Sequence, residues 1–566
     1  MELTEISKIL EQYNQGLSYK KQMGFNDKWG VYEKFKAGDQ WPPPTNATKN
    51  LPRPVFNIIR HIENHKISSV MNEQIKMVYN ATEQGYEEPA DNFTKFAADR
   101  WEKIKQDKLN EEVLESASNI GTGIVHYYWD DNIQGGMGYG YIGEMQGEVI
   151  DPVNFFPGNP QQLDIQKQPY IIITSRDLVD NIKDMAKKNK IPLEQIGLIT
   201  ADRNTTDEAY DSAKYELNGT DKATVITKYW KEKDGYVYFC KVCGNSTVQQ
   251  KTNINRKRYP IAIMQWEKRK KSIFGIGDTE GLIPNQKLIN FLIGMQSLGV
   301  QLTGFPKVVK NSTFIKQPIT NIPGEVIENL DPNGADHIKF LQPAAISPQV
   351  NELVQNIIQN TKDLAGATES STGTLDKSGQ LNATAIMLLQ KAAGVPIEGI
   401  KRRFYQFVED VGLIWEEFFK SNYNTTRVIN TKDEEGNTVP TEFNGSENKD
   451  VELGLRIDIG PSSTYSESLA QTSLDKFFDK GLIDFRTYLQ LAPDNVVPFK
   501  EQLIKILDKQ QAMQQQAAQQ GQQNAMQGAI SQLSPQEQQF LQQNPHIVNN
   551  VMGQGMPQNN NLGGSQ

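Results

Sequence analysis

The sequence has very few cysteines: Cys240 and Cys243 are the only two in 566 residues. Disulfide bonds therefore cannot hold the fold together, and a reducing compartment is indicated. Both stand in the stretch YFCKVCGN, and a C-x-x-C-G knuckle can supply half of a zinc site. The five histidines show no paired spacing that would supply the other half. The neighbouring YVYF and the Gly-Asn pair instead favour a β-hairpin, so we expect no metal site.

Long apolar runs are also missing. No stretch approaches the roughly 20 apolar residues that span a bilayer, and the N-terminal MELTEISKILEQYNQ lacks the apolar region of a signal peptide. We therefore expect no membrane association.

At 566 residues the chain is too long for one core, so several domains or subdomains are expected.

The motifs of common enzyme classes are absent as well. The sequence has no G-x-x-x-x-G-K-[ST] phosphate loop, no G-x-S-x-G nucleophile elbow and no H-E-x-x-H zinc motif. GIGDTEG is glycine-rich, but it lacks the spacing of a dinucleotide-binding loop and precedes a long helix. We therefore expect no catalytic residues, no enzyme activity and no cofactor.

The charge balance is acidic, with a formal net charge of −9. Proteins that hold DNA tightly through its phosphates are usually basic, so tight DNA binding is disfavoured. Three basic clusters stand out, at 256–258, 268–271 and 401–403. The cluster at 401–403 lies off the apolar face of a helix and is expected to be structural. The basic patch consists of Lys268, Arg269, Lys270 and Lys271. It could contact nucleic acid or be an ordinary solvated or ion-paired surface, and the sequence favours neither interpretation.

Apolar periodicity predicts the N-terminal helices. Two amphipathic helices are expected within 2–36, a third over about 54–72 and a fourth over about 91–118. The stretch FKAGDQWPPP separates the second from the third, because its prolines exclude a helix and its Trp would normally be buried. Pro54 suits the first turn of the third helix.

Strands are expected next. NIGTGIVHYYWDD, QPYIIIT and RYPIAIMQW each have the composition of a buried strand. ATVITKYWKEKDGYVYFCKVCGN predicts a hairpin that turns at Asp234-Gly235.

Long helices dominate the second half. They are expected over 278–303, 348–365 and 381–421, and Pro396 should kink the last of them. A β-type segment at 305–347 separates the first two, and the small, polar stretch GATESSTGTLDKSGQL forms a loop before the third. A strand pair, a short helical bundle and a Gln/Asn-rich tail follow. Glu537 is the only Asp, Glu, Lys or Arg from 510 onward, so the tail is expected to be largely disordered.

This order of elements resembles the portal proteins of tailed bacteriophages, particularly those of short-tailed phages. The resemblance covers about residues 30–510 and leaves out the cysteine pair and the tail. It rests on a succession of motifs, which in order are GDQW, LPRPVFN, NIGTGIVHYYWD, IDPVNFFPGNP, GDTEGLIPNQKLIN and NATAIMLLQKAA.

The resemblance implies an α+β portal fold, assembled as a ring. Its expected parts are a helical and β-rich wing (1–275), a first stem helix (276–303), a β-type clip (304–347), a second stem helix (348–365), a tunnel loop (366–381), a long kinked helix with returning wing strands (382–459), a helical crown (460–510) and the low-complexity tail (511–566).

The function that the resemblance implies is that of a head–tail connector in the virion. Portal proteins form rings, typically of twelve subunits, at one capsid vertex. The ring passes double-stranded DNA without reading its sequence during packaging, retention and ejection. Terminase, the major capsid or scaffolding protein and a tail adaptor protein are the expected partners. The chain would be made in the cytoplasm of the host bacterium.

The resemblance also implies site residues. The tunnel loop would face DNA with Thr372, Thr374, Asp376, Lys377, Ser378 and Gln380. The clip would contact terminase and later the adaptor with Lys307, Lys310, Asn311, Lys316 and Glu325. Two alternatives stay open: an enzyme of the packaging machine (a nuclease or ATPase), and a cellular ring or scaffold protein without a DNA role.

Overall fold

The structure of the chain is a computed structural model. The chain divides into two units, Met1–Gly460 and Pro461–Gln566, which we describe separately. The structure describes residues 3–46, 48–49, 51–73, 75–135, 141–202, 222–320, 322, 324–341, 349–367, 383–432, 438–459, 474–492, 503–504, 506–507, 509–510 and 513.

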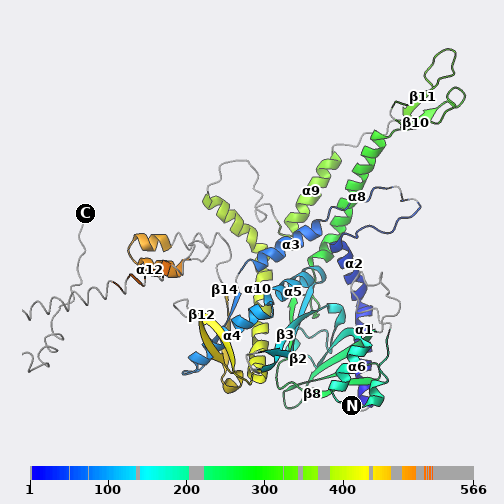
Figure 1. The fold of residues 1–566 in the computed structure, drawn as a ribbon. Helices are drawn as coiled ribbons and strands as arrows, with labels where there is room; N and C mark the ends of the chain where they lie inside the picture. Colours follow the sequence, from blue (N-terminus) through cyan, green and yellow to red (C-terminus); the bar gives the residue numbers. More distant parts are fainter. Residues whose placement is uncertain are drawn as a thin grey trace, which may run out of the picture. The chain divides into compact units, whose positions relative to one another are not determined.

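Unit 1 mixes helices and strands along the chain (Figure 1), as the α+β expectation requires. Its described helices are α1 (Leu3–Met23), α2 (Phe25–Ala37), α3 (Ile58–Met71), α4 (Glu87–Lys103), α5 (Gln106–Ile120), α6 (Val179–Lys188), α7 (Leu193–Ile196), α8 (Asp278–Gly304), α9 (Gln349–Leu364) and α10 (Ala383–Asn422). Its described strands are β1 (Ile75–Ala81), β2 (Thr122–Gly135), β3 (Tyr141–Ile150), β4 (Phe155–Pro157), β5 (Tyr170–Leu178), β6 (Lys222–Lys231), β7 (Val237–Cys243), β8 (Ser246–Asn253), β9 (Ile261–Gln265), β10 (Lys307–Lys310), β11 (Ile338–Leu341), β12 (Arg427–Lys432), β13 (Thr438–Phe443) and β14 (Leu453–Ile459). Short 3-10 turns are η1 (Pro152–Asn154), η2 (Ile165–Lys167) and η4 (Gly445–Asn448).

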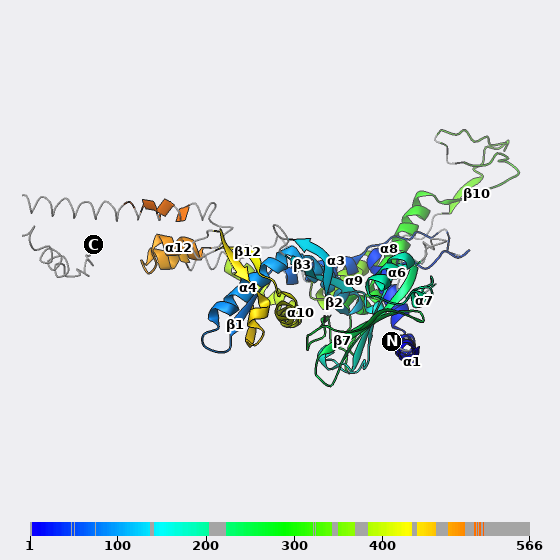
Figure 2. The ribbon, with the colours of Figure 1, turned by 60° about the horizontal axis from the view of Figure 1, so that its bottom comes forward.

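The largest sheet has the order β4-β5-β6-β7-β8, and all its neighbours are antiparallel. Alternate residues of a strand point to opposite faces. Ala223 and Val225 of β6 therefore pack under α6 and α7, while Ile226 packs against α1. Figure 2 shows α6 and α7 beside this sheet. The predicted β6–β7 hairpin is confirmed, and its turn places Gly235 at a φ of 80°, where glycine is favoured.

The two cysteines lie on this sheet, both buried and both free. Cys240 packs in the cluster under α1, and Cys243 in the cluster under α6 and α7. They point to opposite faces of β7, because they are three positions apart along the strand. The strand interpretation of YFCKVCGN is therefore confirmed, and the two thiols do not converge on a common site.

The largest core forms where distant parts of the chain meet. Strands β3-β2-β9 make a second sheet. Strand β1, in the first part of unit 1, pairs with β14, which is the last strand of that unit in the sequence. Helices α4, α5 and α10 cover these strands with an aromatic cluster in which Phe96 and Phe443 stack at 3.9 Å. Pro396 lies inside α10, as expected, and Figure 1 shows this helix changing direction along its length.

Two predicted helices differ from the structure. The segment 91–118 is broken into α4 and α5, because Lys105 adopts a left-handed conformation with a φ of 55°. The third helix begins at Ile58 rather than at Pro54. Asn57 caps it by accepting a hydrogen bond from the Arg60 amide at 3.1 Å, so residues before Asn57 stay extended.

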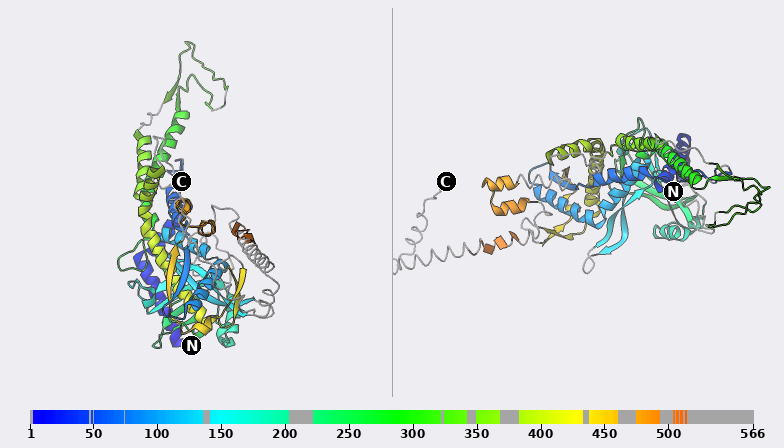
Figure 3. Two further views of the ribbon diagram at one scale, coloured as in Figure 1. Left: turned by 90° about the vertical axis from the view of Figure 1, so that its left-hand side faces the viewer. Right: turned by 90° about the horizontal axis from the view of Figure 1, so that it is seen from above.

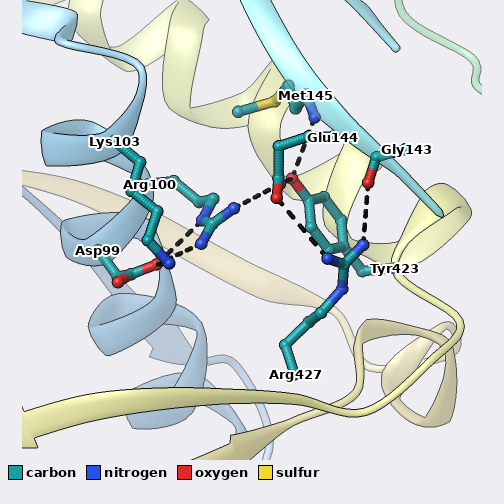
Figure 4. A network of polar contacts seen from close by, with 8 residues as sticks. All are labelled: Asp99, Arg100, Lys103, Gly143, Glu144, Met145, Tyr423 and Arg427. Carbon is teal, nitrogen blue, oxygen red and sulfur yellow. Dashed lines mark hydrogen bonds and ion pairs between the residues drawn. The ribbon is translucent and has the colours of Figure 1, made fainter. Parts of the chain in front are cut away.

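A buried ionic network holds four elements of this core together (Figure 4). Glu144 of β3 lies between Arg100 of α4 and Arg427 of β12, and it accepts a hydrogen bond from the Tyr423 hydroxyl at 2.5 Å. Asp99 contacts the other side of the Arg100 guanidinium at 2.5 Å. Burial lowers the pKa of Arg100, but Tyr423, Glu144 and Asp99 raise it more, so the guanidinium stays charged. Removing one partner of such a network leaves the others buried and unpaired, which costs about 3–5 kcal/mol.

Unit 2 is described only in part. Residues 474–479 are helical, and α12 (Phe485–Leu491) follows after a turn. Asp484 caps α12 through the Thr487 amide at 3.1 Å, and Tyr488 donates to Asp475 at 2.7 Å. Two helical segments of the region 460–510 are thus described. In the part of the chain that the structure covers, no helix is both long and apolar enough to cross a membrane.

We predict that two glycine-to-alanine changes have opposite effects on stability. A Cβ on Gly123 of β2 would lie 2.2 Å from the backbone oxygen of Val113 on α5, so Gly123→Ala should destabilise unit 1 by about 1–3 kcal/mol or more. Gly281 is a helical position of α8 with open space around it, so Gly281→Ala should be neutral or stabilise by up to about 1 kcal/mol. Chemical denaturation measures both, and equal effects would contradict the packing described here.

Candidate functional site

Helix α8 begins on a cluster of buried polar groups from two other helices. Lys66 of α3 forms an ion pair with Asp278 at 2.8 Å. The hydroxyl of Thr279 contacts Glu63 of α3 and lies 2.9 Å from Asn119 Oδ1 of α5. The backbone just before α8 packs so closely that a Cβ on Gly277 would lie 2.4 Å from the Asn119 carbonyl oxygen. The first turn of α8 is therefore fixed by α3 and α5.

Glu63 is the most buried acid of this cluster, with no exposed surface. Burial raises its pKa to about 7, although the Lys36 ammonium at 3.6 Å and the Thr279 hydroxyl act in the opposite direction. The carboxyl group therefore changes protonation state near neutral pH. Its position beneath α8 makes the start of that helix sensitive to this charge.

Two amides of α8 bind the extended segment before α3. Gln286 accepts a hydrogen bond from the Ile58 amide at 2.9 Å and donates to the Phe56 carbonyl at 2.7 Å. Asn290 accepts from the Phe56 amide at 3.1 Å and donates to Gln40 Oε1 at 2.6 Å. Both amides are buried, so each of these bonds satisfies a group that would otherwise be costly to bury.

The stretch FKAGDQWPPP is therefore explained by its partners. Trp41 donates its indole N–H to the Pro54 carbonyl at 2.9 Å, and Gln40 donates to the Phe35 carbonyl at 2.8 Å. The motifs GDQW and LPRPVFN are neighbours in sequence, whereas GDTEGLIPNQKLIN follows more than 200 residues later, yet all three meet at the start of α8. Together they hold one end of this helix.

Beyond this anchor, α8 runs beside α9 toward the β10–β11 hairpin (Figures 1 and 3). Residues 288–304 of α8 carry no charged side chain. We call the residues Met295, Leu298, Leu302 and Phe305 the α8 stripe. Met295, Leu298 and Leu302 follow one another at heptad spacing along α8, and Phe305 is the residue directly after its end. All four are exposed or half-buried, with Phe305 68% exposed. The described residues of this subunit cover Met295, Leu298 and Leu302 only in part.

The predicted clip residues all lie in the segment at the end of α8. Lys307 and Lys310 lie on β10, and Lys310 donates to the Gln317 carbonyl at 2.5 Å. The backbone N–H of Asn311 donates to the His337 carbonyl at 3.0 Å, and Lys316 is exposed. Glu325 accepts a hydrogen bond from the Thr320 hydroxyl at 2.6 Å. The structure brings these residues onto one exposed segment and not into one cluster.

The basic patch divides into two kinds of residue. Arg269 forms an ion pair with Glu280 in the first turn of α8 at 2.9 Å, so it helps to hold that helix. Lys268, Lys270 and Lys271 are exposed. In the cluster at 401–403, Lys401 pairs with Glu73 at 2.6 Å, in agreement with the structural role expected there.

The predicted tunnel-loop residues lie outside the described residues. This applies to Thr372, Thr374, Asp376, Lys377, Ser378 and Gln380. The two ends that the structure describes are α9 with residues 365–367, and the start of α10 at Ala383.

Glu63 and Lys66 were not predicted from the sequence. A signal was present, because both lie on the same helical face as the apolar Ile59 and Ile62, where a charged residue is unusual unless it is paired. No group of three His, Cys, Asp or Glu residues within the described ranges could hold a metal ion.

We predict that Glu63→Gln flattens the pH dependence of stability. The folded-state pKa of about 7 exceeds the ordinary value of 4.5, so the folded chain binds this proton more tightly than the unfolded chain does. The stabilisation from protonated Glu63 is complete below about pH 4.5 and is lost as the pH rises through about 7. Denaturation between pH 5 and pH 8 should show a smaller loss of stability in Glu63→Gln. Glu111→Gln, an exposed change on α5, should follow the unmodified chain; identical curves for all three proteins would disprove the role of Glu63.

Comparison of the sequence with known protein families identifies a family that matches this chain. Residues 141–457, more than half of the chain, match the family described as Phage SU10 portal protein. A comparison with curated proteins found no match. The matched region includes α8, the β10–β11 hairpin, α9 and α10. The chain therefore belongs to the phage SU10 portal protein family.

Proposed function

We propose that the chain is one subunit of a ring of twelve copies that forms a DNA channel at one capsid vertex. The observation that carries this proposal is the α8 stripe on a chain of the portal family. Apolar residues at heptad spacing normally pack into a facing helix, and large exposed apolar surfaces mark interfaces. A contact between different faces of identical subunits produces a ring when the rotation closes.

In this proposal the elements take the parts expected from the resemblance. Residues before α8, together with the strands after α10, form the wing, and α8 and α9 form the stem. The β10–β11 segment is the clip, 366–381 is the tunnel loop, and unit 2 contributes the crown. The exposed side chains of the clip, including Lys307 and Lys316, support a role in binding terminase and then a tail adaptor. The wing would contact the major capsid or scaffolding protein.

The charge supports a conduit more than a DNA-binding protein. Twelve copies at −9 each would carry about −108, which repels phosphates. Tight phosphate binding with its steep salt dependence would oppose sliding. The tunnel loop has one basic residue, Lys377, so it would touch the DNA backbone without reading bases. We infer a structural role in packaging, retention and ejection rather than an enzymatic one, because the sequence lacks the nucleotide-binding and nucleophile motifs of enzymes.

We predict that charges on the α8 stripe prevent ring formation. Met295→Glu with Leu302→Glu would bury two carboxylates in the subunit contact, so association should weaken by at least about tenfold. The subunit itself should stay folded, because Met295 is 47% and Leu302 37% exposed within it. Mass photometry and negative-stain microscopy measure the rings, and circular dichroism measures the fold.

Gln301→Glu is the matched control, because it adds a charge to an exposed position of the same helix outside the stripe. It should leave the rings unchanged. Rings of normal size from the double variant would disprove the stripe as a contact. An unmodified chain that remains a monomer at micromolar concentration would disprove the ring itself.

We predict that the tunnel loop affects DNA retention and not assembly. Asp376→Ala with Lys377→Ala, or a shortened 370–378, should still form rings because these residues belong to a glycine-rich, polar stretch of sequence with few apolar positions for a subunit contact. Filled heads should retain less DNA, measured by pulsed-field electrophoresis of packaged genomes. Full-length DNA at normal yield would show that the loop is only a connection.

A further inference from the structure

A cleft of about 820 Å³ opens beside the α8 anchor, and neither the proposed ring contact nor the proposed DNA channel uses it. Its walls come from α2, from the loop that follows it and from α8. Trp41 and the three prolines after it form one side, and Phe35 and Phe291 contribute on the helix side. Phe291, which is 54% exposed, lies where α8 leaves the anchor, so the cleft is continuous with a solvent-facing apolar surface.

The cleft is held in shape by hydrogen bonds. Trp41 is fixed through Pro54, and Gln40 is fixed between the Phe35 carbonyl and the Asn290 amide. Prolines have few backbone conformations, so the wall that they form is stiff. A preformed apolar cleft binds a partner with little loss of conformational entropy.

The cleft carries more positive than negative charge. Lys34, Arg53 and Lys287 line it, against one carboxylate, Asp39. Arg53 is oriented by its bond to the Pro42 carbonyl at 2.7 Å, and Lys287 lies 5.5 Å from the centre of the Phe35 ring. This local excess is unusual on a chain of net charge −9. It favours an acidic ligand over a basic one.

The apolar walls distinguish between acidic ligands. A phosphate backbone would gain from the three cations but nothing from Trp41, the prolines and Phe35, and it would meet Asp39. A protein segment can offer an apolar side chain to the walls and carboxylates to the rim.

We propose that this cleft binds an extended acidic segment of a partner protein, with an aromatic or aliphatic side chain against Trp41 and carboxylates at Lys34, Arg53 and Lys287. This inference rests on the proposed function at one point: the partner is expected to be another protein of the assembled particle. The occupant would bridge the loop after α2 and the start of α8, so it would also reinforce the α8 anchor.

The first test uses two synthetic peptides with a central Phe-Pro-Phe, one flanked by aspartates and the other by lysines. At low ionic strength the aspartate peptide should bind the full chain at least about tenfold more tightly. Lys34→Glu and Lys287→Glu should each weaken it several-fold, and Lys233→Glu, an exposed change on the β6–β7 turn, should not. Equal binding of the two peptides, no binding of either, or no effect of Lys287→Glu would overturn the proposal. So would a short DNA duplex that displaces the aspartate peptide.

The second test locates the partner in assembled particles. A photo-reactive residue at Val31, an exposed residue of the cleft wall, should cross-link to an acidic segment of a different protein. An adduct to another copy of this chain, an adduct to DNA or the absence of any adduct would overturn the proposal. Ring formation is measured in a separate experiment. If Lys287→Glu loses peptide binding but still forms rings, the cleft is not needed for assembly. A chain that forms no rings but still prefers the aspartate peptide would refute the proposed function and leave the cleft intact.

Discussion

The long helix α8 is exposed on one face beyond its first turns, so its direction is defined mainly by its buried N-terminal end and by its contact with α9. Its direction depends on Thr279, Gln286 and Asn290, which bond to groups from α3, α5 and the loop between α2 and α3. A buried amide left without its partner costs about 1–3 kcal/mol. Any other placement of α8 would break several of these bonds together. The anchor therefore defines where the exposed stripe points, and through it the geometry of any assembly.

The ionic network around Glu144 applies the same constraint at the other side of unit 1. Burial of apolar surface is itself non-directional, so it limits the relative placement of α4, α10 and the β-strands less strictly than paired charges do. Two arginines that share one carboxylate allow few arrangements. Buried ion pairs often add little net stability, so their contribution here lies in choosing one packing arrangement among several.

The sequence was informative where structure is decided locally and much less so where it depends on distant contacts. Apolar periodicity located α8, α9 and α10, and the Asp234-Gly235 turn located a hairpin. The break at Lys105 has no Gly or Pro to mark it. Directly after it, Gln106 is buried and bonds to Asn110 and to the Tyr127 hydroxyl, and these contacts tie the start of α5 to β2. The pairing of Glu63 with Thr279 spans 216 positions, so no local pattern could predict it. The order of weak motifs did predict the family, because those motifs mark the places where distant segments meet.

The pairing of β1 with β14 has a consequence for how the chain is made. Ile75 pairs with Ile459, so the ribosome must add nearly all of unit 1 before β1 finds its neighbour. At about 5–20 residues per second that interval is on the order of tens of seconds. Throughout it the apolar Met77 and Tyr79 lack the partner strand that helps to cover them. Synthesis in the host therefore contains a period in which a nascent subunit is exposed to aggregation, and its yield should depend on how well the cell's chaperones cover that strand.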